Sequence, residues 1–209
     1  MATFRDRSDA GTRLGDALVD RGVTADVVLA IPRGGLPLGR AVADALDAPL
    51  DVVAAKKLGA PHNPELAIGA VASDGSTWLN DELIAELGVS DAEVAEERDR
   101  VAALVREKEE RYRGDRIGEE FEGQRVVIVD DGVATGATAI ACLRRLRAAG
   151  ADRVVLAVPV GSPDTVERLE READEVVALE TPAVFRAVGQ FYDRFEQVQD
   201  EEAMTYLEG

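Results

Sequence analysis

The sequence predicts an α/β fold in which a mainly parallel sheet is flanked by helices. Apolar runs of strand length alternate with segments whose apolar residues recur at helical spacing. This rhythm is typical of a buried sheet covered by helices. The chain has 209 residues, 46% of them hydrophobic, which is enough for one core with a modest appendage. We therefore expect a single domain over residues 1–209.

The elements of the first half are punctuated by Gly22 and Pro49. In chain order they are a helix at Ser8–Arg21, a strand at Val27–Ile31, a helix at Leu36–Asp47 and a strand at Val52–Ala55. The second half repeats the pattern with a strand at Arg125–Asp130, a helix at Thr138–Ala149, a strand at Val154–Val160, a helix at Pro163–Arg171 and a strand at Val176–Leu179.

A loop and a hairpin are predicted between these halves. Lys57–Pro64 contains one glycine and two prolines, which favours a loop over a regular element. Leu66–Ala72 and Ser76–Leu79 then flank Asp74-Gly75, a dipeptide suited to a type I′ turn. A β-hairpin is expected there.

A long charged helix should follow the hairpin, and an aromatic tail should close the chain. Ser90 and Glu93 form a capping-box pattern at the start of a helix that runs through about Tyr112. Residues 181–209 are expected to close the core or to wall a pocket. This tail contains the aromatic residues Phe185, Phe191, Tyr192, Phe195 and Tyr206.

Composition excludes several classes of function. Forty-one acidic residues against 24 basic ones give a formal charge of −17, which disfavours general binding to nucleic acid or to anionic membranes. The acid excess fits either a halophilic protein or an ordinary acidic enzyme. One cysteine, Cys142, excludes a disulfide framework, and its helical neighbours indicate a core position. No apolar leader or membrane-length run is present, so a cytoplasmic location is expected.

The segment Val126–Thr138 contains the pattern most informative about chemistry. An apolar strand ends in Asp130 and Asp131, and a loop of small residues then leads into a helix. At a parallel-sheet edge such a loop presents backbone N–H groups and a positive helix end, which together form an anion site. Glycine allows close approach of a phosphate, and threonine hydroxyls add donors. The acid pair cannot bind phosphate, so it requires sugar hydroxyls or a cation.

The string V-V-I-V-D-D-G-V-A-T-G-A-T resembles the phosphoribosyl-pyrophosphate motif of type I phosphoribosyltransferases. The resemblance implies that Asp130 and Asp131 bind the ribose hydroxyls. It also implies a loop around the 5-phosphate, formed by Ala134, Thr135, Gly136, Ala137 and Thr138. The alternative reading is an acidic strand end like that of response regulators, which does not explain the T-G-x-T pattern.

A second loop fits the same family. Ile31-Pro32-Arg33-Gly34-Gly35 follows a strand and precedes a helix, as the family's pyrophosphate loop does. The resemblance therefore implies pyrophosphate contacts from Arg33, Gly34 and Gly35. Without the first motif, this segment could equally be a tight turn that needs glycine.

Lys57 is the preferred basic partner of pyrophosphate, since the family places a basic residue at this strand end. Lys56 and Lys57 are two of only three lysines, and a solvated pair is the alternative. Residues 57–82 lie where the family places a flexible flap. The string K-L-G-A-P-H-N-P-E-L-A-I-G-A-V resembles a subgroup whose acceptor is generally unassigned. His62, the single histidine, is either an acid-base group or an incidental loop residue.

The resemblance implies that a nitrogen nucleophile displaces pyrophosphate from ribose carbon 1, with Asp130, Asp131, Arg33 and Lys57 as the catalytic set. Magnesium is expected to bind mainly through the substrate, with no dedicated protein ligands. The family also implies a homodimer. Ala134 departs from the 6-oxopurine enzymes, which carry an aspartate base there, so the acceptor stays open.

Two other classes of function remain open. The chain could be a regulatory protein that senses the same sugar phosphate without turnover, although neither a helix-turn-helix segment nor a basic patch is evident. It could also be an α/β phosphate-ester hydrolase that uses Asp130 or Asp131 as its nucleophile. Phosphoribosyl transfer to a nitrogenous base is the reading that the combined motifs favour.

Overall fold

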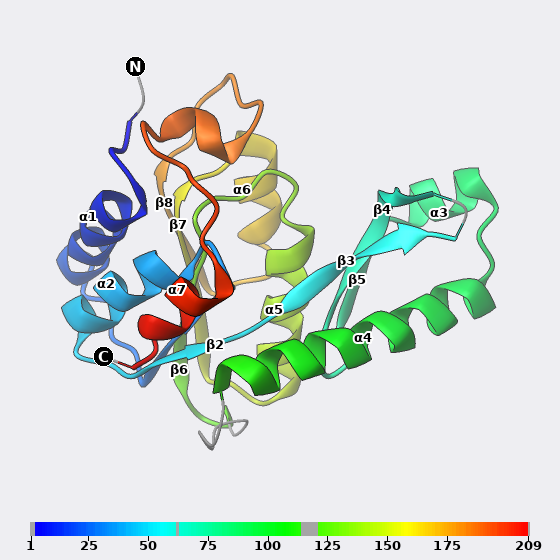
Figure 1. Cartoon of the computed structure of the whole chain (residues 1–209), viewed down its shortest axis with the longest axis horizontal. Coiled ribbons are helices and arrows are strands. Elements are labelled where there is room, and N and C mark those ends of the chain that lie inside the picture. The colour runs from blue at the N-terminus through cyan, green and yellow to red at the C-terminus, as the bar shows by residue number, and fades with distance from the viewer. Residues whose placement is uncertain (1–2, 62, 114–120, 209) are drawn as a thin grey trace.

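The computed structural model describes residues 3–61, 63–113 and 121–208. Its centre is a five-stranded sheet in the order β2-β1-β6-β7-β8 (Figure 1). Its strands are β1 (Val27–Ala30), β2 (Leu50–Val52), β6 (Arg125–Val129), β7 (Arg153–Val160) and β8 (Glu175–Glu180). Every neighbouring pair is parallel, so the carboxyl ends of the strands meet at one edge.

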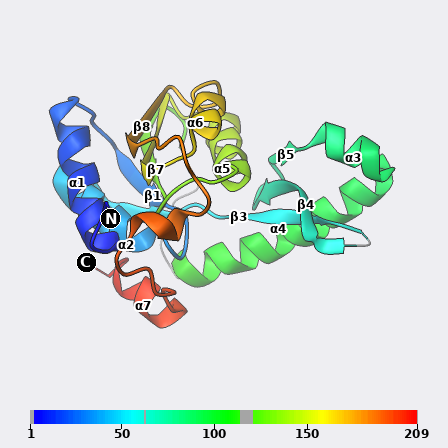
Figure 2. The ribbon, with the colours of Figure 1, turned by 90° about the horizontal axis from the view of Figure 1, so that it is seen from above.

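Helices cover both faces of this sheet (Figure 2). One face packs against α1 (Arg7–Asp20) and α2 (Leu36–Leu46), and the other against α5 (Ala137–Ala148) and α6 (Pro163–Leu169). Successive strand residues point to opposite faces, and Val126–Val129 of β6 and Val154–Val160 of β7 are accordingly apolar and buried throughout. The predicted α/β class is confirmed, and Cys142 is a buried core residue of α5. No helix in the described ranges is both long and apolar enough to cross a membrane.

A second, antiparallel sheet extends away from the first (Figure 1). It consists of β3 (Ala55–Ala60), β4 (Asn63–Ala72) and β5 (Thr77–Leu79). The helices α3 (Asp81–Leu87) and α4 (Asp91–Arg113) complete this unit. We call residues 55–113 the arm. It has its own small core, to which β3, β4 and α4 contribute Leu58, Ile68, Val71, Val101 and Val105.

The prediction of a loop over Lys57–Pro64 is wrong, because β3 continues to Ala60 and β4 begins at Asn63. Lys56 and Lys57 therefore lie within β3 rather than at the end of a strand of the parallel sheet. β3 and β4 approach each other closely at Gly59, where only glycine has room. A Cβ on Gly59 would lie 2.6 Å from the carbonyl oxygen of Pro64, and the register shifts at this point.

The hairpin around Asp74-Gly75 is confirmed, but its predicted type I′ turn is wrong. That turn needs positive φ at two consecutive residues, whereas Gly75 has φ 93° and Asp74 is not among the described residues with positive φ. The Gly75 amide donates to the Ala72 carbonyl, and the Ala72 amide donates to the Ser76 carbonyl. This is a three-residue loop with glycine after the turn. The Asp74 side chain accepts from the Ser76 amide at 2.9 Å, which gives this amide a hydrogen-bond partner within the loop.

The predicted capping box at Ser90 and Glu93 is confirmed. The Ser90 amide donates to Glu93 Oε2 at 2.9 Å, and the Glu93 amide donates to Ser90 Oγ at 3.3 Å. The short helix α3 was not predicted. Its seven residues have no buried side chain and begin with an Asn80 cap, so the apolar periodicity that marks a helix is weak there.

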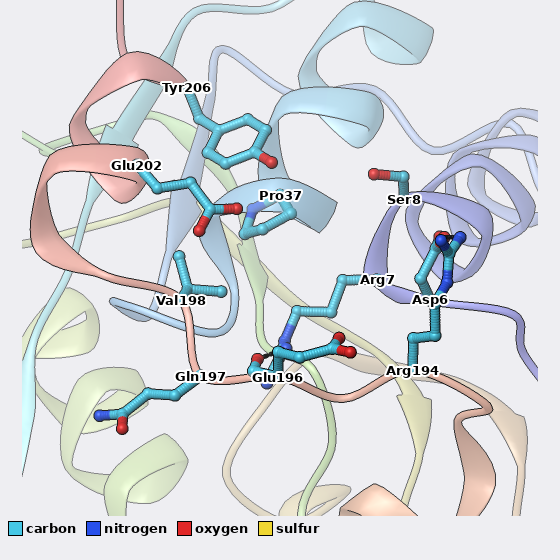
Figure 3. A pocket seen from close by; sticks show the side chains of 10 residues that line it. All are labelled: Asp6, Arg7, Ser8, Pro37, Arg194, Glu196, Gln197, Val198, Glu202 and Tyr206. Atoms are coloured by element: carbon cyan, nitrogen blue, oxygen red, sulfur yellow. Dashed lines mark hydrogen bonds and ion pairs between the residues drawn. The ribbon is translucent and has the colours of Figure 1, made fainter.

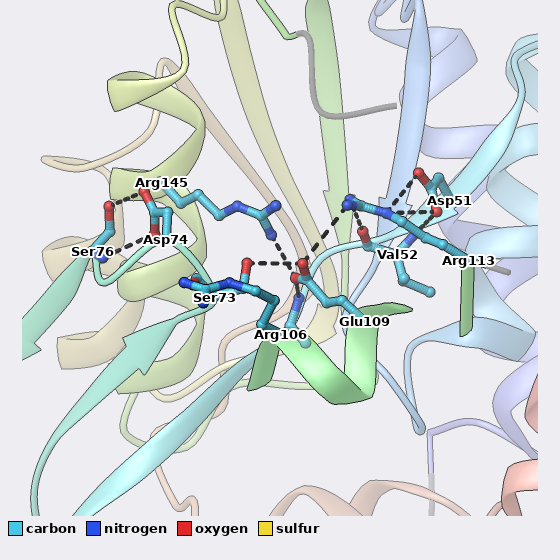
Figure 4. Close-up of polar contacts among 10 residues, drawn as sticks. Asp51, Val52, Ser73, Asp74, Ser76, Arg106, Glu109, Arg113 and Arg145 are labelled. Atoms are coloured by element: carbon cyan, nitrogen blue, oxygen red, sulfur yellow. Dashed lines mark hydrogen bonds and ion pairs between the residues drawn. The ribbon is translucent and has the colours of Figure 1, made fainter. Parts of the chain in front are cut away.

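A buried ionic network fastens the arm to the parallel sheet (Figure 4). Glu109 of α4 is 2% exposed and accepts from the Ala54 amide, from Ser73 Oγ and from Arg145 of α5. Arg113, one helical turn further on, pairs with Asp51 of β2 at 3.2 Å. Because each buried charge has partners, the network holds α4, β2 and α5 in fixed relation.

The C-terminal segment returns to the beginning of the chain. It contains the 3-10 helix η1 (Val188–Phe191) and the helix α7 (Asp200–Thr205). Phe4 bridges to Tyr192, which is buried, and the other tail aromatics pack against the core between α1, α2 and the sheet. The expectation that the tail closes the core is therefore confirmed.

Candidate functional site

The segment after β6 forms a sharp strand-to-helix loop at the carboxyl edge of the sheet. β6 ends at Val129, the acid pair Asp130-Asp131 follows, and α5 begins at Ala137. Gly136 is the residue before α5 and has φ 73°, a left-handed conformation that side chains disfavour. We call residues 132–138 the β6–α5 loop.

The backbone of the β6–α5 loop presents a set of unused hydrogen-bond donors. In the described parts of the chain, the amides of residues 134–139 donate to no protein acceptor. The carbonyl of Ala134 accepts from Thr165 Oγ1 at 2.7 Å, and that of Thr135 accepts from Arg168 at 3.3 Å. Side chains from α6 thus hold the carbonyls and leave the amides available. This arrangement is a backbone anion site at a helix N-terminus.

The loop borders an open cavity of about 360 Å³ between the arm and α6. Thr135 is exposed at this cavity, and Lys57 of β3 reaches it from the arm. Arg168 of α6 lines it as well, with its guanidinium 5.8 Å from the centre of the Trp78 ring. The two cations and one carboxylate, Asp164, that line the cavity leave an excess of positive charge beside the free amides, which favours an anionic ligand.

Lys56 and Lys57 have different surroundings because successive strand residues point in opposite directions. Lys57 lines the cavity beside the β6–α5 loop. Lys56 lies on the α4 side, where its charge acts on Lys108 and Glu97. The structure thus brings Lys57 to the loop, from within a strand of the arm.

The acid pair is largely withdrawn from solvent. Burial raises the pKa of the Asp130 carboxyl well above its ordinary value, and the charge of Asp131 raises it further. Burial also raises the pKa of Asp131, although the guanidinium of Arg7 opposes this shift. Asp130 Oδ1 accepts from the Asp131 amide at 2.8 Å. Two carboxyl groups with raised pKa values favour a ligand that donates hydrogen bonds or carries a positive charge.

Arg7, the first residue of α1, is the direct partner of Asp131. Its Nη2 lies 2.8 Å and its Nε 2.9 Å from Asp131 Oδ2. The guanidinium also lies 3.9 Å from the centre of the Phe195 ring, and it donates to the carbonyl of Glu196 at 2.7 Å. Tyr192 adds a hydrogen bond of 2.6 Å to the Asp131 carbonyl. The N-terminal helix and the tail therefore jointly fix the second acid.

The loop between β1 and α2 lies against the acid pair. A Cβ on Gly34 would lie 2.1 Å from Asp131 Oδ2, and one on Gly35 would lie 2.6 Å from the Val129 carbonyl oxygen. Glycine is thus required at both positions for close contact with the end of β6. The structure brings together the two loops that the sequence singled out. Arg33 is in the same loop, and its guanidinium pairs with Asp200 at 3.5 Å.

Comparison with known proteins identifies a family that matches this chain. The model described as the phosphoribosyl transferase domain matches residues 13–195. The chain belongs to this family. A Mycobacterium tuberculosis protein provisionally classed as a phosphoribosyl transferase is 48% identical over 209 residues, which are 100% of this chain and 47% of the relative. The chain thus spans about half the length of the curated relatives it matches.

Two further proteins are similar to this chain over very different lengths. A Thermus thermophilus protein of known crystal structure is 45% identical, with a TM-score of 0.83 over 99% of this chain and 98% of that one. A uracil phosphoribosyltransferase from Streptomyces griseus is 40% identical over 57 residues, 27% of each protein. The first likeness covers the whole phosphoribosyl transferase domain, arm included, and the second covers a short part.

A second cavity of this phosphoribosyl transferase domain lies on the tail side of Arg7 (Figure 3). Its volume is about 410 Å³. The walls come from the start of α1, from Pro37 of α2 and from the tail, which contributes Glu196, Glu202 and Tyr206. Arg7 lines this cavity and also binds Asp131. The tail therefore walls a pocket in addition to closing the core.

Two site residues were not predicted from the sequence. Arg7 is 124 positions from Asp131, and no local spacing links them. Arg168 is 33 positions from Thr135 and belongs to another helix, so its approach to the β6–α5 loop depends on tertiary packing. His62, singled out in the sequence, lies outside the described residues.

Proposed function

We propose that this domain transfers the phosphoribosyl group of 5-phosphoribosyl-1-pyrophosphate to a nitrogenous base and releases pyrophosphate. One observation carries the proposal: the free amides of residues 134–139, the buried acid pair and the glycine loop of Arg33 lie together at one sheet edge. The substrate offers a phosphate, two ribose hydroxyls and a pyrophosphate. These three groups require an amide nest, hydrogen-bond acceptors and cations, respectively.

In this proposal the β6–α5 loop binds the 5-phosphate. The amides of Ala134, Thr135, Gly136, Ala137 and Thr138 donate to its oxygens, and the hydroxyls of both threonines add to them. The open cavity of about 360 Å³ beside the loop supports this assignment, since a phosphate can approach from solvent. Arg168 supplies positive charge from α6.

The ribose and pyrophosphate assignments follow from the neighbours of Asp131. Asp130 and Asp131 accept from the two ribose hydroxyls, and Arg7 keeps Asp131 oriented. Arg33, Gly34 and Gly35 hold the pyrophosphate, with Lys57 contributing from the arm. Because Gly34 touches the Asp131 carboxylate, the two substrate groups would be held by adjacent backbone.

The reaction is a substitution at ribose carbon 1. The bond from this carbon to the pyrophosphate oxygen breaks, a bond from the acceptor nitrogen forms, and the nitrogen loses its proton. Positive charge develops on the sugar ring and negative charge on the leaving group. The ionised acid pair stabilises the ring, and Arg33 with the loop amides stabilises the pyrophosphate.

Magnesium would be bound mainly by the substrate in this proposal. Among the described residues no group of three or more acidic, histidine or cysteine side chains converges as a metal site. The acid pair can add oxygens to a cation held by pyrophosphate and ribose. When bound, magnesium neutralises charge on the leaving group.

The acceptor is proposed to be a planar base of the nucleobase type. The cavity beside Arg7 supports this class, because its wall combines the Tyr206 ring with the carboxylates of Glu196 and Glu202. These groups can stack on a ring and accept from its N–H groups. The uracil enzyme matched over 57 residues is consistent with such an acceptor.

Release of labelled pyrophosphate tests the proposed function. The protein is incubated with labelled phosphoribosyl pyrophosphate and magnesium, alone and with each base of a panel. We expect release that depends on one base. Release without any base would indicate a hydrolase, and tight binding without release in any mixture would indicate a sensor. Either of these outcomes contradicts the transferase.

A further inference from the structure

Asp200, the first residue of α7, lies among cations from two other elements. Its Oδ1 is 3.5 Å from Nη1 of Arg33 and accepts from the Tyr112 hydroxyl at 2.6 Å. Arg111 of α4 forms an ion pair with the same carboxylate. Lys108, also on α4, donates to the carbonyl of Pro32 at 3.4 Å. The end of α4 therefore lies against the loop of Arg33, with one carboxylate between them.

Positive charge exceeds negative charge at this place. Within the described ranges, Asp200 is the single carboxylate paired with Arg33 or with Arg111, and no carboxylate pairs with Lys108. Burial and the charge of Arg33 lower the pKa of Lys108, the charge of Asp200 raises it in part, and the charges of Lys56 and Arg111 lower it further. A group of cations whose repulsion is only partly compensated is suited to an anion with more than one charge.

Donor geometry points to the same conclusion. Arg33 and Arg111 present guanidinium forks and Tyr112 presents a hydroxyl, and all three now serve the two oxygens of one side chain. A pyrophosphate offers more oxygens and more charge than a carboxylate, so it can use these donors more completely. Asp200 would then compete with it for the same groups.

We propose that Lys108 and Arg111 of α4 complete the pyrophosphate site around Arg33, and that Asp200 occupies this site until pyrophosphate binds. This inference rests on the proposed function, because the function places the leaving group at the loop of Arg33. It adds α4 and α7 to a site built from the parallel sheet. It also couples leaving-group binding to the tail, since displacement of Asp200 releases the start of α7.

Calorimetry with inorganic pyrophosphate and magnesium tests the cations. Lys108→Gln and Arg111→Gln should each weaken binding about threefold to tenfold, the range for one partly exposed charged contact. Arg98→Gln removes a charge from the same helix at a position paired with Asp99, and it should bind as the wild type does. Unchanged affinity in both cluster variants would overturn the proposal.

Asp200→Asn tests whether Asp200 competes with pyrophosphate, and here tighter binding is expected. Removal of the competing charge should tighten pyrophosphate binding about threefold to tenfold. Such a gain cannot result from loss of folding. Glu201→Gln, the same change at the exposed neighbouring position, should have no effect. Equal or weaker binding in Asp200→Asn would contradict the role assigned to Asp200.

The inference and the function fail in different ways. If the wild type releases pyrophosphate in a base-dependent manner while the α4 and Asp200 variants bind pyrophosphate as it does, only the inference is overturned. If the wild type binds neither pyrophosphate nor phosphoribosyl pyrophosphate, both are overturned.

Discussion

Asp130 and Asp131 are adjacent carboxyl groups at the carboxyl edge of the sheet, and burial raises the pKa of each. Their folded-state pKa values lie above the unfolded ones, so ionising the pair costs stability as the pH rises from the unfolded value through the folded value. The affinity for substrate depends on pH with the opposite sign. A ribose hydroxyl donates to an ionised carboxylate, so affinity should rise over the same pH window.

The affinity for phosphoribosyl pyrophosphate should therefore increase about tenfold as the pH rises from the ordinary aspartate pKa of about 3.9 through the raised pKa values of the pair. Calorimetry across this range measures it. The double variant Asp130→Asn with Asp131→Asn provides the baseline, because it contains neither titrating carboxyl group and the ionisation of the ligand itself affects both proteins equally. Arg7→Met should move the rise to higher pH, since the guanidinium opposes the raised pKa of Asp131. A wild type that shows the same pH dependence as the double variant would argue against ionised acids at the ribose.

At the scale of the element, α4 connects the arm with the parallel sheet. The buried Glu109 carboxylate accepts from Arg145 of α5 at 2.5 Å and from the Ala54 amide next to β3 at 2.5 Å. Removal of this carboxylate would take one acceptor away from the buried Arg145 guanidinium and from the buried Ala54 amide. The same helix carries Lys108 and Arg111, so its position also determines the proposed pyrophosphate contacts.

Glu109→Ala should lower the free energy of unfolding by about 3–5 kcal/mol, the cost of breaking a buried ion pair on one side. Urea unfolding followed by circular dichroism measures this change. The control is Glu110→Ala, which removes an exposed carboxylate from the next position of the same helix and should stay within about 0.5 kcal/mol of the wild type. Equal losses in the two variants would show that the network contributes little stability.

The arm also shows where element prediction from the sequence fails. Apolar runs marked β1, β6, β7 and β8 of the parallel sheet, because strands buried on both faces need apolar residues. The strand predicted at Val52–Ala55 was misplaced, since β2 spans Leu50–Val52 and contains Asp51. Most of β3 was interpreted as a loop because Lys57–Pro64 contains one glycine and two prolines. In an antiparallel pair with one solvated face, lysines are tolerated, and Gly59 permits the close approach of β4.

At the scale of the whole molecule, the candidate site combines what local sequence can predict with what it cannot. The β6–α5 loop and the loop of Arg33 were predictable, since each is a short continuous motif whose backbone is suited to binding an anion. Their meeting at one edge follows from the adjacent parallel strands β1 and β6. The contacts of Arg7, Arg168 and Asp200 were not predictable, because they join segments far apart in the chain.

The double variant Asp130→Asn with Asp131→Asn tests the central claim, that the acid pair binds the ribose while the adjacent loop binds its phosphate. The amides keep the size of the side chains but lose the charge that accepts from hydroxyls. Calorimetry with phosphoribosyl pyrophosphate should show affinity reduced about hundredfold, two charged hydrogen-bonding groups at about 1.5 kcal/mol each. An affinity equal to that of the wild type, in a double variant that melts cooperatively, would contradict the ribose assignment and the function built on it.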